Sequence, residues 1–433
     1  MAQAHSSHGH GGSNTITSAQ TRWVLGGIVG FLAVAAVAGA FVLRPDADRP
    51  VLADALGFSG ELVQATATTV LDVPCLNTAE ADGIRCSRVT IEVTSGPTNG
   101  EEAFFEIPVS DASARIDVGD RLVVQYDADN PAELQYFFQD FQRDRPLMLL
   151  GVLFAVAVIA LGRWQGVRAL IALGVIGLVL IGFAFPSILD GNDPTAVAMV
   201  AAVIIALVAL YLTHGVTEMI TVALLGTFAA LVLTAVLAVI FTNFANFTGF
   251  GSEDAFYLQF ASAKIDVKGL ILAGIIVGSL GVLDDVTVTQ VSAVWQLHEA
   301  NPDYGVRRLY TSAVTIGRDH IASTVNTLVL AYAGASLPLI LVFAQAGRSL
   351  TQVAVGELVA VEIVRTLVGS IGLVAAVPMT TALAAFVATR GSAPGSPDPP
   401  IAPTPRPPTE LVAEPTATNA AWDDFAPDQP AGW

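Results

Sequence analysis

The stretch GLILAGIIVGSLGVLDDVTVTQ, residues 269–290, begins as an apolar, glycine-rich run and then places two carboxylates side by side, Asp284 and Asp285. It belongs to a longer run, 267–294, that contains no other acidic residue. About 20 apolar residues are enough for an α-helix to cross a bilayer, because each residue adds about 1.5 Å. The run therefore predicts a membrane-spanning helix with paired carboxylates at or near its end.

Glycines and polar residues follow one face of this predicted helix. Gly274, Gly278, Gly281 and Asp285 are three or four positions apart, the spacing that places side chains on one helix face. Small residues let neighbouring helices approach closely in membranes. We therefore expect this face to pack against another helix and Asp285 to face protein. Asp284 lies about 100° round the helix and is expected to point to water or to an inner cavity.

The rest of the chain contains further apolar runs. Of its 433 residues, 53% are hydrophobic and only 13% are charged, which is typical of a polytopic membrane protein. Residues 23–43 are expected to form an uncleaved first span, which brings the expected total to about eight transmembrane helices. The other runs lie near residues 146–161, 169–185, 195–213, 219–241, 267–294, 321–343 and 366–387.

The formal net charge of −18 is concentrated in two segments. Residues 45–143 contain 18 acidic residues against 6 arginines, a net of −12, and residues 391–433 contain 6 against 1, a net of −5. The expected organisation is a disordered cytoplasmic leader (1–22), a first transmembrane helix (23–43), an extracytoplasmic β-domain (45–143), a transmembrane helical bundle (146–389) and a disordered, proline-rich, acidic cytoplasmic tail (391–433).

Arginines determine the expected orientation. With the N-terminus inside, six of them fall on the cytoplasmic side, where Lys and Arg are in excess in membrane proteins. We therefore expect both termini in the cytoplasm. The six are Arg163, Arg168, Arg307, Arg308, Arg318 and Arg390.

Residues 45–143 alternate apolar and polar side chains in SRVTIEVTS, EAFFEIPVS and DRLVVQYDA. This period of two predicts strands, so we expect a small all-β domain between the first two helices, with an OB-like or another small barrel fold. Both cysteines of the chain, Cys75 and Cys86, lie in this segment. Outside the cytoplasm a local disulfide is the favoured interpretation, with two free thiols as the alternative.

Two later segments also contain polar faces. Thr315, Asp319, Ser323 and Asn326 are three or four residues apart in one of them. In the other, Glu362 is placed to pair with Arg365 within one helical turn. Residues 350–365 are less apolar, and both a re-entrant or interfacial helix and an ordinary connecting helix fit them.

Carboxylates provide charge and hard oxygen ligands, and hydroxyl and amide groups complete coordination or relay protons. The functional hypothesis is a proton or cation site built from Asp285, Asp284, Asn326, Glu362 and Asp319. The alternative is that these groups satisfy one another and fix helix packing. For Asp319, close to a predicted cytoplasmic helix end, the packing role is favoured. The sequence identifies no particular metal.

Signatures of soluble enzymes are missing from the sequence. It contains no Walker A loop, no HExxH and no nucleophile elbow. We expect no enzyme activity and no cofactor, and an intramembrane hydrolase ranks third among the functions considered. The partners expected are the lipid bilayer and a small ion or solute, not nucleic acid. A protein partner and the oligomeric state are not predicted.

Several segments together resemble a known family. They are GRWQGVRALIAL, GVLDDVTVTQVSAVWQLHEANP, IGRDHIASTVNTLVLAYAGASLPLILVF and VEIVRTLVGSIGLVAAVPMTT, and over about 87–389 the chain resembles the YibE/F family of bacterial membrane proteins. The resemblance implies a multi-pass protein of the bacterial plasma membrane with a β-rich segment before the main bundle. It implies an acidic residue at Asp285, with Asp284 and His320 as departures, and it provides no established activity.

The leading hypothesis is a transporter or channel-like permease for a small solute or ion, proton-coupled through Asp285, with Asn326 and Glu362 as polar contributors. The alternative is a non-transporting scaffold or accessory protein. In that case the extracytoplasmic β-domain binds a partner and the polar faces serve only to pack helices.

Overall fold

The computed structural model describes residues 19–46, 60–75, 85–110, 114–251, 253–261, 264–345, 347 and 349–391. Most of the expected leader (1–22) and nearly all of the expected tail (391–433) lie outside these residues. The last four residues of that leader, 19–22, are helical, because the first helix begins at Ala19.

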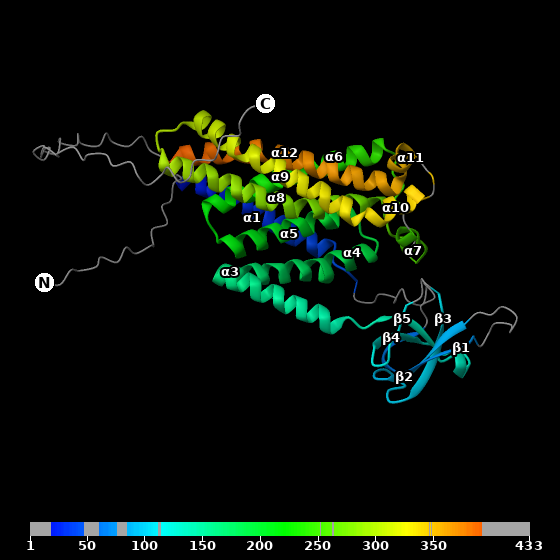
Figure 1. Cartoon of the computed structure of the whole chain (residues 1–433). Helices are drawn as coiled ribbons and strands as arrows, with labels where there is room; N and C mark the ends of the chain where they lie inside the picture. Colours follow the sequence, from blue (N-terminus) through cyan, green and yellow to red (C-terminus); the bar gives the residue numbers. More distant parts are fainter. Residues whose placement is uncertain are drawn as a thin grey trace, which may run out of the picture. The chain divides into compact units, whose positions relative to one another are not determined.

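The helical region is organised around α8 (Val267–Ala300). This helix packs against α5 (Pro194–His214), α6 (Glu218–Phe244), α9 (Val306–Ala335) and α12 (Glu357–Gly391). Figure 1 shows these helices side by side. In the sequence, α8 contains the stretch with the two aspartates, so the pair lies on the helix that contacts most of the others.

Six helices among the described residues are long and apolar enough to cross a membrane. A seventh span results if α9 and α10 (Leu337–Gln345), which meet at a bend of 56°, are taken as one. The mainly helical, multi-pass architecture is thus confirmed. The count differs from the expected eight because two of the predicted runs belong to one continuous element.

That element comprises α3 (Asp144–Val179), a π-helical turn (Leu180–Ala184) and α4 (Phe185–Leu189). Its backbone is broken at Arg163, which has φ 50° and ψ −127°. A Cβ on Gly166 would overlap the carbonyl oxygen of Val158, so the chain folds back closely after the break. Figure 1 shows α3 as such a hairpin.

The remaining helices are α1 (Ala19–Val42), α7 (Glu253–Ala261) and α11 (Leu350–Val355). The segment 350–365 is therefore not one separate helix. Its first part is α11, and its second part is the beginning of α12, which continues without a break to Gly391.

Small and hydroxyl-bearing residues lie at several of the contacts between the helices. Thr227 and Thr234 of α6 are both fully buried. A Cβ on Gly372 of α12 would overlap the hydroxyl of Thr234, and one on Gly226 would lie 2.5 Å from the hydroxyl of Thr380. This is the packing by small residues that lets helices approach closely in membranes.

The β-domain is a single antiparallel sheet with the strand order β3-β2-β1-β4-β5. The strands are β1 (Glu61–Pro74), β2 (Arg85–Val93), β3 (Glu102–Pro108), β4 (Arg121–Tyr126) and β5 (Tyr136–Phe141). A register shift in β1 between Ala67 and Thr69 marks a bulge, and bulges bend strands. The edge strands β3 and β5 come close to each other, so the sheet curls into a half-barrel.

The core of the β-domain follows the predicted period of two. In β2, Val89, Ile91 and Val93 are buried, and Thr90 and Glu92 between them are not. Residues from all five strands join this core. A β-domain between the first two spans is therefore confirmed.

Candidate functional site

Asp284 and Asp285 lie near the middle of α8, which continues for fifteen residues beyond them to Ala300. Val291 and Val294 of α8 share a core cluster with Leu25 and Val222, from the first turns of α1 and α6. The end of the bundle is therefore level with Val294. The two carboxylates lie about 14 Å inside it, at 1.5 Å per residue.

The structure contradicts the expectation that Asp285 faces protein. Asp285 is exposed on the outer side of α8, as is Gly281, which has nothing within 4 Å of its Cβ position. Asp284 is the partly buried one, and its Oδ1 is buried without a hydrogen-bond partner. The glycine-bearing face is open at Gly281 and Asp285, whereas Gly274 and Gly278, earlier on that face, lie against side chains of α12 and α9.

Nearby hydroxyl groups are already engaged. Thr287 Oγ1 lies 3.1 Å from the backbone carbonyl of Asp284 and 2.6 Å from the hydroxyl of Thr227. Thr289 Oγ1 donates to the carbonyl oxygen of Asp285 at 2.8 Å. These threonines therefore do not satisfy the carboxylates.

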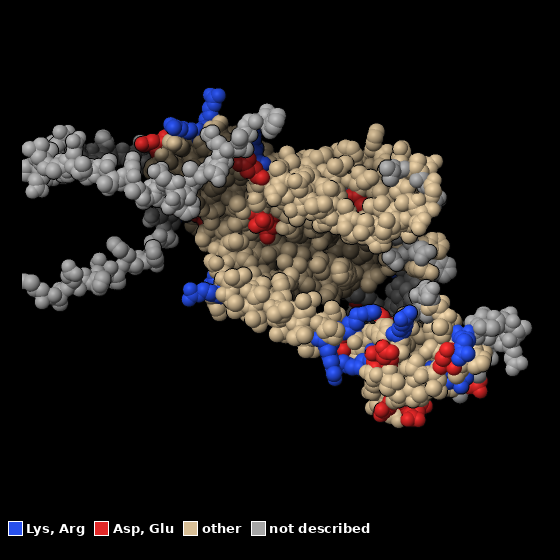
Figure 2. Space-filling model, in the orientation of Figure 1, with Lys and Arg blue, Asp and Glu red and all other residues tan. Residues whose placement is uncertain are grey.

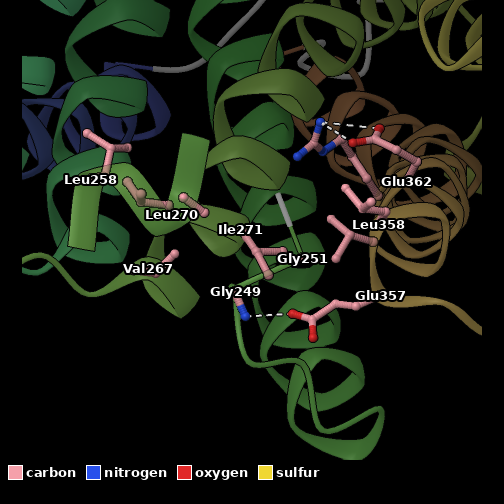
Figure 3. Close-up of a pocket in the computed structure, with 12 residues that line it drawn as sticks. Gly249, Gly251, Leu258, Val267, Leu270, Ile271, Glu357, Leu358 and Glu362 are labelled. Carbon is pink, nitrogen blue, oxygen red and sulfur yellow. Dashed lines mark hydrogen bonds and ion pairs between the residues drawn. The ribbon is translucent and has the colours of Figure 1, made fainter. Parts of the chain in front are cut away.

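A second charged group lies on the first turns of α12. Glu362 and Arg365 form an ion pair with 3.0 Å between Oε1 and Nη1, as the sequence predicts. They line a cavity of about 260 Å³, together with Glu357 and apolar side chains of α7 and α8. Figure 3 shows this cavity, with Glu357 bonded to the backbone of Gly249 and Glu362 joined to its cationic partner.

The carboxylate of Glu357 organises the loop after α6. Its Oε1 accepts from the backbone N–H groups of Thr248 (2.8 Å) and Gly249 (2.6 Å), and its Oε2 accepts from the Thr248 hydroxyl (2.8 Å). Because three donors already bind this carboxylate, its negative charge is stabilised without a ligand. Glu357 therefore holds this loop against the beginning of α12.

Arg365 is only partly satisfied. Its Nε is buried without a hydrogen-bond partner, and its Nη2 lies 3.3 Å from the Cβ position of Gly274 on α8. Gly278, one turn further, similarly lies beneath the hydroxyl of Tyr332, at 3.2 Å. Two of the three predicted packing glycines thus lie against the polar end of a side chain from another helix.

The predicted site residues are not gathered in one place. Asp319 and Asn326 are exposed on α9, and within the described part of the chain no hydrogen bond or ion pair joins them to Asp284 or Glu362. The ten residues between Gly274, beside Arg365, and Asp284 correspond to roughly 15 Å of helix. The structure therefore separates an α8 carboxylate pair from an α12 ion pair.

Gln290 is a buried polar residue that the sequence analysis overlooked. It is 3% exposed, and its Nε2 donates to the Ala313 carbonyl and to Thr381 Oγ1, each at 2.8 Å. It thus ties α8 to α9 and α12. The signal was present in the sequence, because an amide within VTVTQVSAVW interrupts an otherwise apolar run.

An apolar groove of about 560 Å³ lies next to the α12 cavity. Its walls come from the π-helical turn, α4, α5 and α8, and it shares Leu258 and Leu270 with that cavity. Figure 2 shows a hollow on this face of the helical region, whose surface is mostly uncharged. A volume between about 300 and 1,000 Å³ is usual for ligand pockets.

In the β-domain, Cys75 and Cys86 form a disulfide in the structure. Within the described residues, no group of three or more His, Cys, Asp or Glu side chains is arranged to hold a metal ion.

Apolar helices of spanning length, packed through small residues and buried hydroxyls, define a multi-pass membrane protein. Residues 150–390 match the family described as YibE/F-like protein, which is more than half of the chain. The chain belongs to this family. The match begins at residue 150, not near residue 87 as expected, so the β-domain lies outside it. No curated protein and no solved structure matches the chain.

Proposed function

We propose that this YibE/F-like protein is a permease for a small solute or ion, and that the α8 carboxylates bind a proton or a cation during transport. Asp284 takes the central role that the sequence suggested for Asp285. The α12 ion pair, beside the cavity and the apolar groove, contributes to the solute path. This role includes no chemical conversion of the solute and no cofactor.

One observation carries the proposal. Asp284 lies well inside the bundle, and its Oδ1 is buried without a hydrogen-bond donor among the described residues. A carboxylate within a membrane costs about 2.5–3.5 kcal/mol even on insertion scales. A carboxylate with a buried, unpartnered oxygen at this depth is a candidate for binding a cation or a proton.

The proposed topology has eight crossings. The α3 hairpin contributes two of them, and the bent α9–α10 pair contributes one. An even number places both termini on the same side, which the arginine distribution suggests is the cytoplasm. The β-domain with its disulfide then lies outside the cytoplasm, in an oxidising compartment. The membrane is the bacterial plasma membrane.

The test is thermal unfolding of the full-length protein in detergent against Na⁺, K⁺, Mg²⁺ and Ca²⁺ and across pH, for wild type, Asp284→Asn and Asp285→Asn. A ligand that binds only the folded state stabilises it by about 2.7 kcal/mol at a hundredfold excess over Kd. We expect a saturable shift in wild type that Asp284→Asn abolishes and Asp285→Asn weakens. The responding species is then followed as flux into proteoliposomes.

Gln290→Leu is the matched control, because it removes a buried polar group whose role is packing. It should lower the unfolding temperature while the ion- or pH-dependent shift remains. If no species shifts the wild type, and Asp284→Asn is simply less stable, the permease proposal fails. A binding partner lost on surface changes in the β-domain would then support the scaffold alternative.

A further inference from the structure

The outer face of α9 carries a regular row of exposed side chains. They follow one another at intervals of 4, 3, 4, 3 and 4 residues, the 3.5-residue repeat of helices that pack along a seam. Most are small or polar, which is the composition of helix contacts in membranes. The row consists of Thr315, Asp319, Ala322, Asn326, Val329 and Ala333, all exposed, and its last two members also line a cavity beside α12. This row of residues is named the α9 seam.

The α9 seam lies at the depth of the bundle interior. Gly317 of α9 lies against Gln290 of α8, and at the other end Tyr332 reaches Gly278. Between these two contacts, Ile321 and Val325 join Val282 in one cluster. The part of α9 with Asp319 and Asn326 therefore runs beside the middle of α8. Lipid at this depth provides no partner for an amide or a carboxylate.

The charges beside the seam are self-complementary. Arg318 and Asp319 are adjacent and both exposed, and neither has an ion pair within the described residues. They lie on opposite sides of the centre line of the seam. A twofold axis parallel to α9 therefore places the guanidinium of each copy beside the carboxylate of the other.

We propose that the α9 seam is the contact between two copies of this chain, related by a twofold axis along the membrane normal. Asn326 of each copy meets its counterpart, and a single amide in such a seam fixes register and oligomeric state. Ala322 and Ala333 let the two backbones approach closely. The dimer removes Asp319 and Asn326 from lipid, and neither has a hydrogen bond or ion pair within the described part of one chain.

The first test is disulfide cross-linking in proteoliposomes. The two natural cysteines are bonded to each other, so an introduced cysteine is the only free thiol. Ala322→Cys, at the centre of the seam, should give a covalent dimer on mild oxidation. Ile240→Cys on α6 is the control, because Ile240 is 53% exposed but lies away from the seam. Equal cross-linking of both variants, or none at position 322, overturns the proposal.

The second test uses charge reversal, with the mass of the detergent-solubilised full-length protein measured by light scattering. Wild type should be dimeric, and Arg318→Glu or Asp319→Lys alone should shift it towards monomer at least tenfold in dissociation constant. The double variant restores opposite charges and should restore the dimer. Unfolding temperatures near that of wild type show that the variants are folded. A monomeric wild type, or a double variant weaker than both single ones, overturns the proposal.

Discussion

The β-domain and the helical bundle differ in what they leave exposed. In the β-domain the large aliphatic side chains are inside, and Val89 and Ile91 are fully buried. In the bundle, α6 buries Leu224, Leu231 and Thr227 completely, yet Ile240 of the same helix is 53% exposed. Hydrophobicity thus distinguishes inside from outside in the β-domain but not in the bundle, where large apolar side chains lie on both sides.

The difference follows from the solvent that each region faces. Water drives large apolar groups into the core of the β-domain by about 25 cal/mol per Å². Lipid tails are as apolar as leucine, so a bundle in a bilayer gains little from turning its largest side chains inward. It gains from close contact instead, which small residues permit. The same kind of substitution should therefore change stability differently in the two regions.

The largest expected difference is between two Ile→Ala changes. Ile91→Ala in β2 removes a fully buried side chain and should destabilise the β-domain by about 2–5 kcal/mol. Ile240→Ala in α6 removes an exposed one and should change stability by no more than about 0.5 kcal/mol. Hydrogen exchange of strand and α6 peptides in the full-length protein measures both. Similar losses in the two regions would contradict the comparison.

A smaller effect is expected when small residues in the bundle are enlarged. Gly372→Ala introduces a Cβ that overlaps the Thr234 hydroxyl and should cost about 1–3 kcal/mol. Gly281→Ala, also in a helix, meets nothing within 4 Å and should stabilise by roughly 0.5–1 kcal/mol, because alanine favours the helix over glycine. Thermal unfolding followed by tryptophan fluorescence distinguishes them. The contrast is refuted if both variants move in the same direction.

The smallest effect concerns the one buried tyrosine of the β-domain core. Tyr136 shares a 2.9 Å hydrogen bond with Thr98, and burial raises the pKa of its hydroxyl. Tyr136→Phe should cost about 0.5–1.5 kcal/mol at neutral pH.

The pH dependence of this cost has a defined sign. A raised pKa in the folded state stabilises the protein fully below the unfolded value near 10, and this contribution is lost as the pH rises through the folded pKa. The cost of Tyr136→Phe should therefore shrink in alkali. Calorimetry of the full-length protein, in the transition that Ile91→Ala shifts, measures it. A cost independent of pH would contradict this reading.

Much of the architecture could be predicted from the sequence. Runs of about 20 apolar residues are long enough to span a bilayer, and alternation in segments such as SRVTIEVTS predicts half-buried strands. The Glu362–Arg365 pair was predictable because it lies within one turn of a single helix. These features depend on neighbours along the chain, which is why one sequence is enough to determine them.

Tertiary structure alone decided which side of each helix is inside. In α8 the glycines and Asp285 indicated a buried face, yet that face is open at Gly281 and Asp285, and Asp284 and Gln290 point inward. Periodicity reveals that a helix has two faces, but in a membrane an apolar face suits lipid as well as protein. The hairpin at Arg163 and the separation of the α8 and α12 charged groups likewise depend on contacts between distant segments, which no local pattern records.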